Sequence, residues 1–125
     1  LAPRRVTQVV QLVDVAPTLL EMLGLAAEER FRGRSFADLA AGKPARGQRY
    51  AFSTSSLQDD EQNQIRMRSV QDERWKLIVG TDTLSATLYD LKADAAETRD
   101  VSQDHADIVV RLRDVLSQHI NGVVK

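Results

Sequence analysis

The sequence predicts an α+β protein in which a small antiparallel sheet of three or four strands is packed by a C-terminal amphipathic helix. Between residues 65 and 91, apolar residues alternate with polar ones at the period of half-buried strands. Between residues 105 and 119, apolar residues recur at helical spacing. The chain has 125 residues, of which 42% are hydrophobic. It is therefore long enough and apolar enough to form a modest core.

The segment before the sheet is expected to begin with a short strand and a helix. Val and Leu dominate residues 6–13, as in a mostly buried strand. Asp14 then stands where a helix N-cap would accept backbone N–H groups. Pro17 falls in the first turn and Gly24 is placed to end the helix. We therefore expect a helix at about residues 15–23.

A shorter helix and a linker are predicted next. Ser35 can cap a helix that carries Phe36 and Leu39 and that Gly42 and Pro44 end. Residues 42–47 form the best candidate linker in the chain.

The sheet itself is expected to begin with Tyr50-Ala51-Phe52, followed by a long polar loop from Ser53 to Gln64. Two strands with period-two alternation follow, and a hairpin turn joins them. The expected segments are Ile65–Arg68, the turn Val70–Arg74, Trp75–Val79, a loop Gly80–Ser85 and a third strand Ala86–Leu91.

The last helix has the strongest pattern. Ile108, Leu112 and Leu116 recur every four residues, and adjoining apolar positions broaden the face (Val109, Val115 and Ile120). Ser102 or Asp104 could cap this helix, which runs from about residue 105 to 119. Asn121-Gly122 should end it.

Composition excludes several functional classes. Net charge is −1, with basic and acidic residues interspersed, so a nucleic-acid binder is not indicated. There is no cysteine, which excludes disulfides, thiolate metal sites and a cysteine nucleophile. No apolar stretch approaches the ~20 residues of a membrane-spanning helix. The opening Leu1-Ala2-Pro3-Arg4-Arg5 is neither a methionine start nor a signal peptide, and we expect the chain to be an excised segment.

No residue is predicted to be catalytic, cofactor-binding or metal-binding. Asp14 and Asp90 could be ligands, but a helix cap and a turn that accepts backbone donors explain them more simply. His105 and His119 would lie about 21 Å apart on one helix, too far to share a metal. His105 is expected to be solvated, and His119 to complement the helix dipole.

Four cationic side chains on or beside two paired strands have two interpretations (Arg66, Arg68, Arg74 and Lys76). They could form a cationic strip suited to an anionic ester. The favoured interpretation is the solvated face of a half-covered sheet, balanced by nearby Asp and Glu. Two acidic clusters, Glu28-Glu29-Arg30 and Asp59-Asp60-Glu61, are most simply solvated loop charges. The polar loop Ser53–Gln64 is long for its position, and such loops are often functional.

Four segments follow one another in a familiar order. They are Val13-Asp14-Val15-Ala16-Pro17-Thr18-Leu19-Leu20 with Leu23-Gly24-Leu25, then Phe31-Arg32-Gly33-Arg34-Ser35-Phe36, then Ile65–Arg68 with Arg74-Trp75-Lys76-Leu77-Ile78, and Leu88-Tyr89-Asp90-Leu91 through Thr98. Together they resemble the C-terminal region of type I sulfatases, in the alkaline phosphatase superfamily. Ala95-Ala96 departs from the family's usual Pro-Gly, and Asp100-Val101 from its Asn-Leu.

This resemblance implies a domain division and a set of absent parts. Residues 1–47 would be the end of the sulfatase α/β domain and a linker, and residues 48–125 the C-terminal subdomain. The family's nucleophile is a formylglycine made from a Cys/Ser-x-Pro-x-Arg motif, beside calcium or a similar divalent ion. The chain lacks that motif, because none of its three prolines has Cys or Ser two residues before it. The resemblance thus implies that catalysis and its cofactors belong to a missing N-terminal catalytic domain.

The predicted function is therefore the C-terminal subdomain of a sulfatase-like hydrolase of sulfate esters, catalytically inert alone. Its role would be structural, with the loop Ser53–Gln64 at the rim of the substrate pocket, where it helps to choose the alcohol part of the ester. The alternatives are the tail of a phosphonate or phosphate monoester hydrolase, or a stand-alone interaction or dimerisation module. Similar enzymes are commonly periplasmic or secreted. Without the parent domain, the apolar segment Val6–Leu23 is expected to self-associate.

Overall fold

The computed structural model describes residues 3, 5–26, 28, 30–58, 64–80 and 85–122. The chain divides into two compact units, the first up to Tyr50 and the second from Ala51 onward. In the ranges above, no helix is both long enough and apolar enough to cross a membrane.

The first unit contains three short helices. A 3-10 helix, η1 (Leu12–Asp14), leads directly into α1 (Val15–Met22), and α2 (Ala37–Ala40) follows. The predicted helix at 15–23 is thus confirmed. The α2 helix begins two residues after Ser35, whose hydroxyl accepts the Ala37 N–H at 3.1 Å. Gly42, at φ 81°, follows the helix as predicted, in a conformation that an L-residue with a side chain rarely adopts.

The predicted strand at residues 6–13 is wrong. Residues 5–11 have no regular structure. Leu12 and Val13 belong to η1, and their exposed fractions are 91% and 55%. A strand needs a neighbour to take up its backbone N–H and C=O groups, and none pairs with this segment in the part of the chain that the structure describes. Apolar composition alone therefore gave the wrong element.

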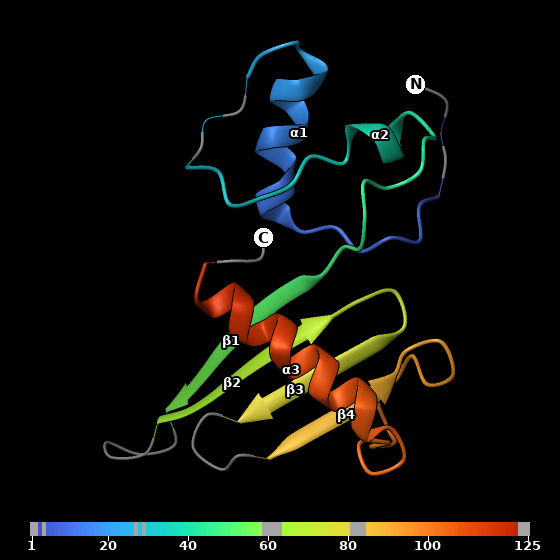
Figure 1. Cartoon of the computed structure of the whole chain (residues 1–125), viewed down its shortest axis with the longest axis vertical. Helices are drawn as coiled ribbons and strands as arrows, with labels where there is room; N and C mark the ends of the chain where they lie inside the picture. Colours follow the sequence, from blue (N-terminus) through green and yellow to red (C-terminus); the bar gives the residue numbers. More distant parts are fainter. Residues whose placement is uncertain are drawn as a thin grey trace. The chain divides into compact units, whose positions relative to one another are not determined.

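The second unit confirms the predicted α+β class. Its sheet has four antiparallel strands in the order β1-β2-β3-β4, and the helix α3 (Ala106–Ile120) lies across one face (Figure 1). The strands are β1 (Ala51–Gln58), β2 (Gln64–Gln71), β3 (Trp75–Gly80) and β4 (Ala86–Asp90).

The long polar loop predicted from Ser53 to Gln64 is also wrong. β1 continues through this segment to Gln58, and β2 already begins at Gln64, opposite it in the register. Ser and Thr side chains made the segment look like a loop, but hydroxyl residues suit the exposed edge of a sheet. The acidic residues predicted as loop charges, Asp59-Asp60-Glu61, lie outside the described residues.

The core lies between the sheet and α3. Val70, Leu77 and Leu88 oppose one another in the register of β2, β3 and β4, so they share a face. All three are 0% exposed, as is Leu112 of α3. Each such side chain contributes about 1.5–3 kcal/mol when fully buried. This layer fixes which face of the sheet the helix covers.

The ends of α3 differ in how well they match expectation. His105 precedes the first turn, and no side chain caps it, so the predicted caps at Ser102 and Asp104 are wrong. Asn121 and Gly122 end the helix as predicted, with Gly122 at φ 77°. Ile120 is 50% exposed, which makes the apolar face narrower than its sequence pattern suggests.

Candidate functional site

Asp14 is the centre of a buried polar cluster in the first unit. Asp14 was expected to cap α1, but its side chain makes no capping hydrogen bond to that helix. One carboxylate oxygen accepts the Arg34 N–H at 2.8 Å, and the other accepts the Gln11 N–H at 2.9 Å. Asp14 is only 4% exposed. Both of its carboxylate oxygens are therefore engaged in contacts within the fold.

Arg49 supplies the positive charge of this cluster. Its Nη2 lies 2.7 Å from Asp14 Oδ2. The remaining guanidinium N–H groups donate to backbone carbonyls of Val9 (3.0 Å), Ser35 (3.0 Å) and Arg34 (2.9 Å). One side chain thereby joins three segments that are far apart in sequence. Sequence reasoning missed Arg49, because nothing local marks a side chain whose partners lie up to 40 residues away.

Thr18 and Gly33 complete the cluster. The Thr18 hydroxyl donates to the Asp14 carbonyl at 2.5 Å and accepts the Phe36 N–H at 3.0 Å. Gly33 lies directly against the Val13 carbonyl, where an added Cβ would be 1.9 Å from the oxygen. The segments Val13–Leu20 and Phe31–Phe36, singled out in the sequence, are therefore two halves of one structural contact.

A second set of carboxylates organises the connection between β4 and α3. Asp90 Oδ1 accepts the Lys92 N–H at 3.2 Å, as the turn interpretation predicted, and Oδ2 accepts Arg74 Nη2 at 2.7 Å. The Arg74 side-chain hydrogen bond holds the pKa of Asp90 below its ordinary value. Asp94 accepts the Arg99 and Thr98 N–H groups at 2.8 and 2.7 Å. These backbone bonds, that of Arg99 first, lower the pKa of Asp94.

Asp100 lies at the end of this connection and binds a backbone N–H of β4. Its Oδ1 accepts the Leu88 N–H at 3.0 Å and the Ser102 N–H at 2.9 Å. Burial raises the pKa of Asp100, but the two backbone bonds outweigh it and leave the pKa lowered. All three carboxylates thus act as acceptors for the fold in their charged form.

Asp72 ties the β2–β3 turn to α3. Its Oδ1 accepts the N–H groups of Arg74 and Trp75 at 2.9 and 2.7 Å, and its Oδ2 accepts Arg111 Nη2 at 2.9 Å. The sequence predicted the turn but not this bond to the helix, which spans 39 positions. An Asp at the start of a turn was the available signal.

The proposed cationic strip does not exist as one surface. In the register, Arg68 opposes Val79, whereas Lys76 opposes Gln71, so Arg68 and Lys76 lie on opposite faces of the sheet. Arg74 and Lys76 each have an anionic partner, Asp90 and Glu97. The side chain of Arg66 lies outside the described residues. The favoured interpretation is right that nearby Asp and Glu balance Arg74 and Lys76. It is wrong about a single face, because Arg68 and Lys76 lie on opposite faces.

The two histidines serve packing contacts. His105 was expected to be solvated, but its ring lies 4.8 Å from that of Trp75 and is half-buried. His119 stacks on Phe52 with ring centroids 3.6 Å apart. The first contact anchors the start of α3 on β3, and the second anchors its end on β1.

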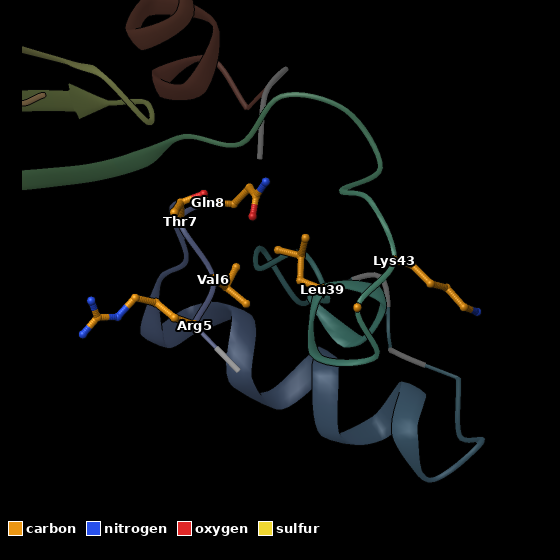
Figure 2. Close-up of a pocket in the computed structure, with 7 residues that line it drawn as sticks. Arg5, Val6, Thr7, Gln8, Leu39 and Lys43 are labelled. Atoms are coloured by element: carbon orange, nitrogen blue, oxygen red, sulfur yellow. The ribbon is translucent and has the colours of Figure 1, made fainter. Parts of the chain in front are cut away.

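A pocket of about 190 Å³ lies between the N-terminal segment and α2 in the first unit. Val6 and Leu39 face this space, while the Arg5 and Lys43 side chains extend away from it on opposite sides (Figure 2). Ligand pockets usually measure about 300–1,000 Å³ and contain polar groups that converge on the ligand. This pocket is smaller than that, and its two charged side chains do not converge on it. In the part of the chain that the structure describes, no three His, Asp or Glu side chains are grouped so as to hold a metal ion.

Comparisons with known proteins agree on one family. Residues 2–122 match the family model described as N-sulphoglucosamine sulphohydrolase, C-terminal. Among curated proteins, arylsulfatase K of Gallus gallus is 28% identical over 94% of this chain. The chain spans only 23% of the length of that relative.

Solved structures share the fold. A sulfatase candidate from Bacteroides thetaiotaomicron is 25% identical with a TM-score of 0.74, covering 88% of this chain and 24% of its own. A glycosaminoglycan 2-O-sulfatase is 24% identical with a TM-score of 0.73 over the same shares. A phosphonate monoester hydrolase from Silicibacter pomeroyi is 22% identical with a TM-score of 0.64, covering 85% and 24% of the two chains.

Proposed function

Because this chain belongs to the family described as N-sulphoglucosamine sulphohydrolase, C-terminal, we propose that it is the C-terminal part of a sulfatase-like hydrolase of sulfuric esters. Its role is structural, and the chemistry belongs to residues that are not in this chain. Residues 1–47 are the end of the α/β domain with a linker, and residues 48–125 are the C-terminal subdomain.

The observation that carries this proposal is how the family-like segments use their polar groups. Asp14, Asp90, Asp94 and Asp100 each accept backbone N–H groups within the fold. A carboxylate engaged in this way stabilises a turn or a segment contact and is poorly placed to receive a proton from substrate. The resemblance to sulfatases therefore lies in the scaffold.

The cofactors of the parent enzyme would likewise lie elsewhere. A formylglycine needs a Cys or Ser in the Cys/Ser-x-Pro-x-Arg setting, and the sequence contains no such motif. The described residues contain no group suited to a divalent cation. We propose that formylglycine and calcium, or a similar ion, are supplied by the N-terminal catalytic domain of the longer protein.

The surface of the first unit supports docking onto that domain. Its exposed large apolar side chains gather on or near η1 and α1: Val6, Val10, Leu12, Val13, Val15, Leu19, Met22, Leu23 and Leu25. So many exposed apolar side chains in one short segment support an interface there. We propose that the catalytic domain covers it in the longer protein, and that two fragments associate through it when that domain is absent.

The β1–β2 hairpin is proposed to contribute to the rim of the substrate pocket. Each of its strands has eight residues, and the rim loop predicted from the sequence falls within this hairpin. Replacing its connection, residues 59–63, by Gly and Ser in the longer enzyme should change the preference among esters of different alcohols without lowering the amount of folded protein. The same rate profile across a panel of sulfate esters would show that the hairpin has no such role.

A phosphonate or phosphate monoester hydrolase is the second candidate. The shared fold with the enzyme from Silicibacter pomeroyi favours keeping it, because nothing in the C-terminal scaffold chooses between sulfuryl and phosphoryl transfer. The reading frame upstream of Leu1 discriminates the candidates. A Cys/Ser-x-Pro-x-Arg motif behind an Asp-Asp pair would support a sulfatase, and a different nucleophile would support a phosphoester hydrolase. An unrelated domain, or none, would favour a stand-alone module.

Testing the structural role needs the longer protein and a matched pair of variants. Asp14→Ala should lower the yield of folded enzyme, while the specific activity of the molecules that do fold should stay the same. Arg46→Ala, which removes ion pairs of an exposed side chain with Glu21 and Asp38, should change neither quantity. Loss of specific activity with normal folding in Asp14→Ala would make Asp14 part of the chemistry and refute the structural role.

A further inference from the structure

The two edges of the sheet are treated differently by the fold. At β4, the segment after the strand occupies the outward backbone groups of Leu88: Val101 N–H donates to its carbonyl at 2.9 Å, and Asp100 accepts its N–H at 3.0 Å. A strand that added at this edge would have to displace both bonds. At the other end of the sheet, no strand lies beyond β1 in the part of the chain that the structure describes.

β1 also lacks the features that usually keep an edge strand from pairing. It is eight residues long, Ala-Phe-Ser-Thr-Ser-Ser-Leu-Gln, with no charged residue and no proline. Natural edge strands are commonly short, interrupted by a bulge, or marked with Lys or Pro. Three consecutive residues in its middle, Ser53, Thr54 and Ser55, are exposed. A strand of this composition can accept another strand by backbone hydrogen bonds.

We propose that β1 pairs antiparallel with β1 of a second copy of this chain, joining the two sheets into one. Two antiparallel neighbours in a sheet are related by a two-fold axis perpendicular to it, which keeps the helix-covered faces on the same side. With the axis at Thr54, this residue opposes its own copy, and Ser53 opposes Ser55 of the other chain. All the central pairs are then hydroxyl pairs, a favourable cross-strand combination.

Charge does not oppose this pairing. The nearest described cation on the same face is Arg68, which opposes Thr54 on β2. In the dimer the two Arg68 residues are three strand spacings apart, about 14 Å at the usual ~4.8 Å between strands. That exceeds the Debye length of about 8 Å at physiological salt. A second copy matches this edge because it brings the same uncharged hydroxyl residues.

This association is distinct from one through the apolar surface of the first unit, and variants separate the two. Thr54→Lys and Thr54→Glu each place like charges across the axis, while Leu19→Lys puts a charge on the exposed face of α1. Because the apolar surface is proposed to associate as well, the Thr54 changes are made in the Leu19→Lys background, which removes that association. Light scattering during size exclusion should give twice the 13.9 kDa chain mass for Leu19→Lys alone. Each Thr54 variant in that background should be monomeric, and an equimolar mixture of the two should recover the dimer.

Hydrogen exchange gives a second readout that a loss of folding would not imitate. Within residues 53–55, the amides that point away from β2 should exchange more slowly in Leu19→Lys than in the same variant with Thr54→Lys added, while those of Val70 and Leu77 should be equally protected in both. In the Leu19→Lys background, a monomer before any Thr54 change, a dimer that survives either Thr54 change, or a mixture that stays monomeric would overturn the proposal.

Discussion

The carboxylate of Asp14 and the guanidinium of Arg49 form an ion pair, 2.7 Å from Oδ2 to Nη2, whose side chains are only 5% and 7% exposed. The pair joins the start of α1 to the residue that precedes Tyr50 at the end of the first unit. Arg49 also binds three backbone carbonyls. Both charges are therefore desolvated and satisfied by the fold, which is the condition under which a buried pair can be retained.

Removing one partner of this pair should be costly. We expect Asp14→Ala to destabilise the first unit by about 3–5 kcal/mol, since it leaves the Arg49 charge buried without a counter-ion. Asp14→Asn should cost less, because its amide oxygen can still accept a backbone N–H. Urea denaturation measures the effect, with Arg46→Ala as the exposed control. Equal midpoints for Asp14→Ala and the control would contradict the buried-pair interpretation.

Gly33 should tolerate no side chain. A Cβ would lie 1.9 Å from the Val13 carbonyl oxygen, so either the Arg34–Asp14 bond or the backbone must give way. We expect Gly33→Ala to destabilise the first unit by about 2 kcal/mol or more. Exposed Arg32, its neighbour, provides the control as Arg32→Ala. Thermal unfolding that is the same for both variants would show that the contact is not tight.

The two faces of the sheet should respond differently to truncation. Leu77 is fully buried under α3, whereas Met67 is 40% exposed on the other face. Leu77→Ala should cost about 2–5 kcal/mol, and Met67→Ala less than about 1 kcal/mol. Denaturant unfolding of the second unit measures both. Similar losses for the two variants would mean that the core has been assigned to the wrong face.

The second unit should lose stability in acid. The pKa values of Asp90, Asp94 and Asp100 are all below the ordinary aspartate value of 3.8 in the folded chain. Groups of this kind stabilise the fold above the unfolded-state pKa, and that contribution is lost as the pH falls through the lower folded values. The denaturant concentration at the midpoint of unfolding should therefore fall as the pH is lowered below about 4.

Asp94→Asn isolates one of these groups. The variant should be less stable than the wild type near neutral pH, and its stability should change less between about pH 4 and pH 2. Thr98→Ala, which keeps the backbone donors of Asp94, should retain most of the acid dependence. If Asp94→Asn has the same pH profile as the wild type, the backbone bonds do not set the pKa of Asp94.

Regular periodicity made part of the fold predictable. The alternation in β3 and the four-residue spacing of Leu112 and Leu116 identified a strand and the covering helix correctly. The strand predicted before Asp14 failed because apolar residues do not specify what they pack against. β1 was predicted only at its start, Tyr50-Ala51-Phe52, since the run of Ser and Thr that follows carries little apolar pattern.

The polar contacts could be predicted only in part. Asp90 was correctly interpreted as a turn residue, because its backbone donor is two positions away. Arg49 and Arg111 were missed because their partners lie 35 and 39 positions away, beyond any local pattern. Arg68 and Lys76 were wrongly assigned to one face, since apolar residues occur on both faces of β2 and leave the phase of the alternation undefined.

The most direct test of the central claim is hydrolysis of a chromogenic aryl sulfate by the purified 125-residue chain, beside the longer protein that contains it. The structural role predicts no turnover above the buffer blank for the chain and steady turnover for the longer protein. Turnover by the chain that co-purifies with it through successive columns would contradict the account.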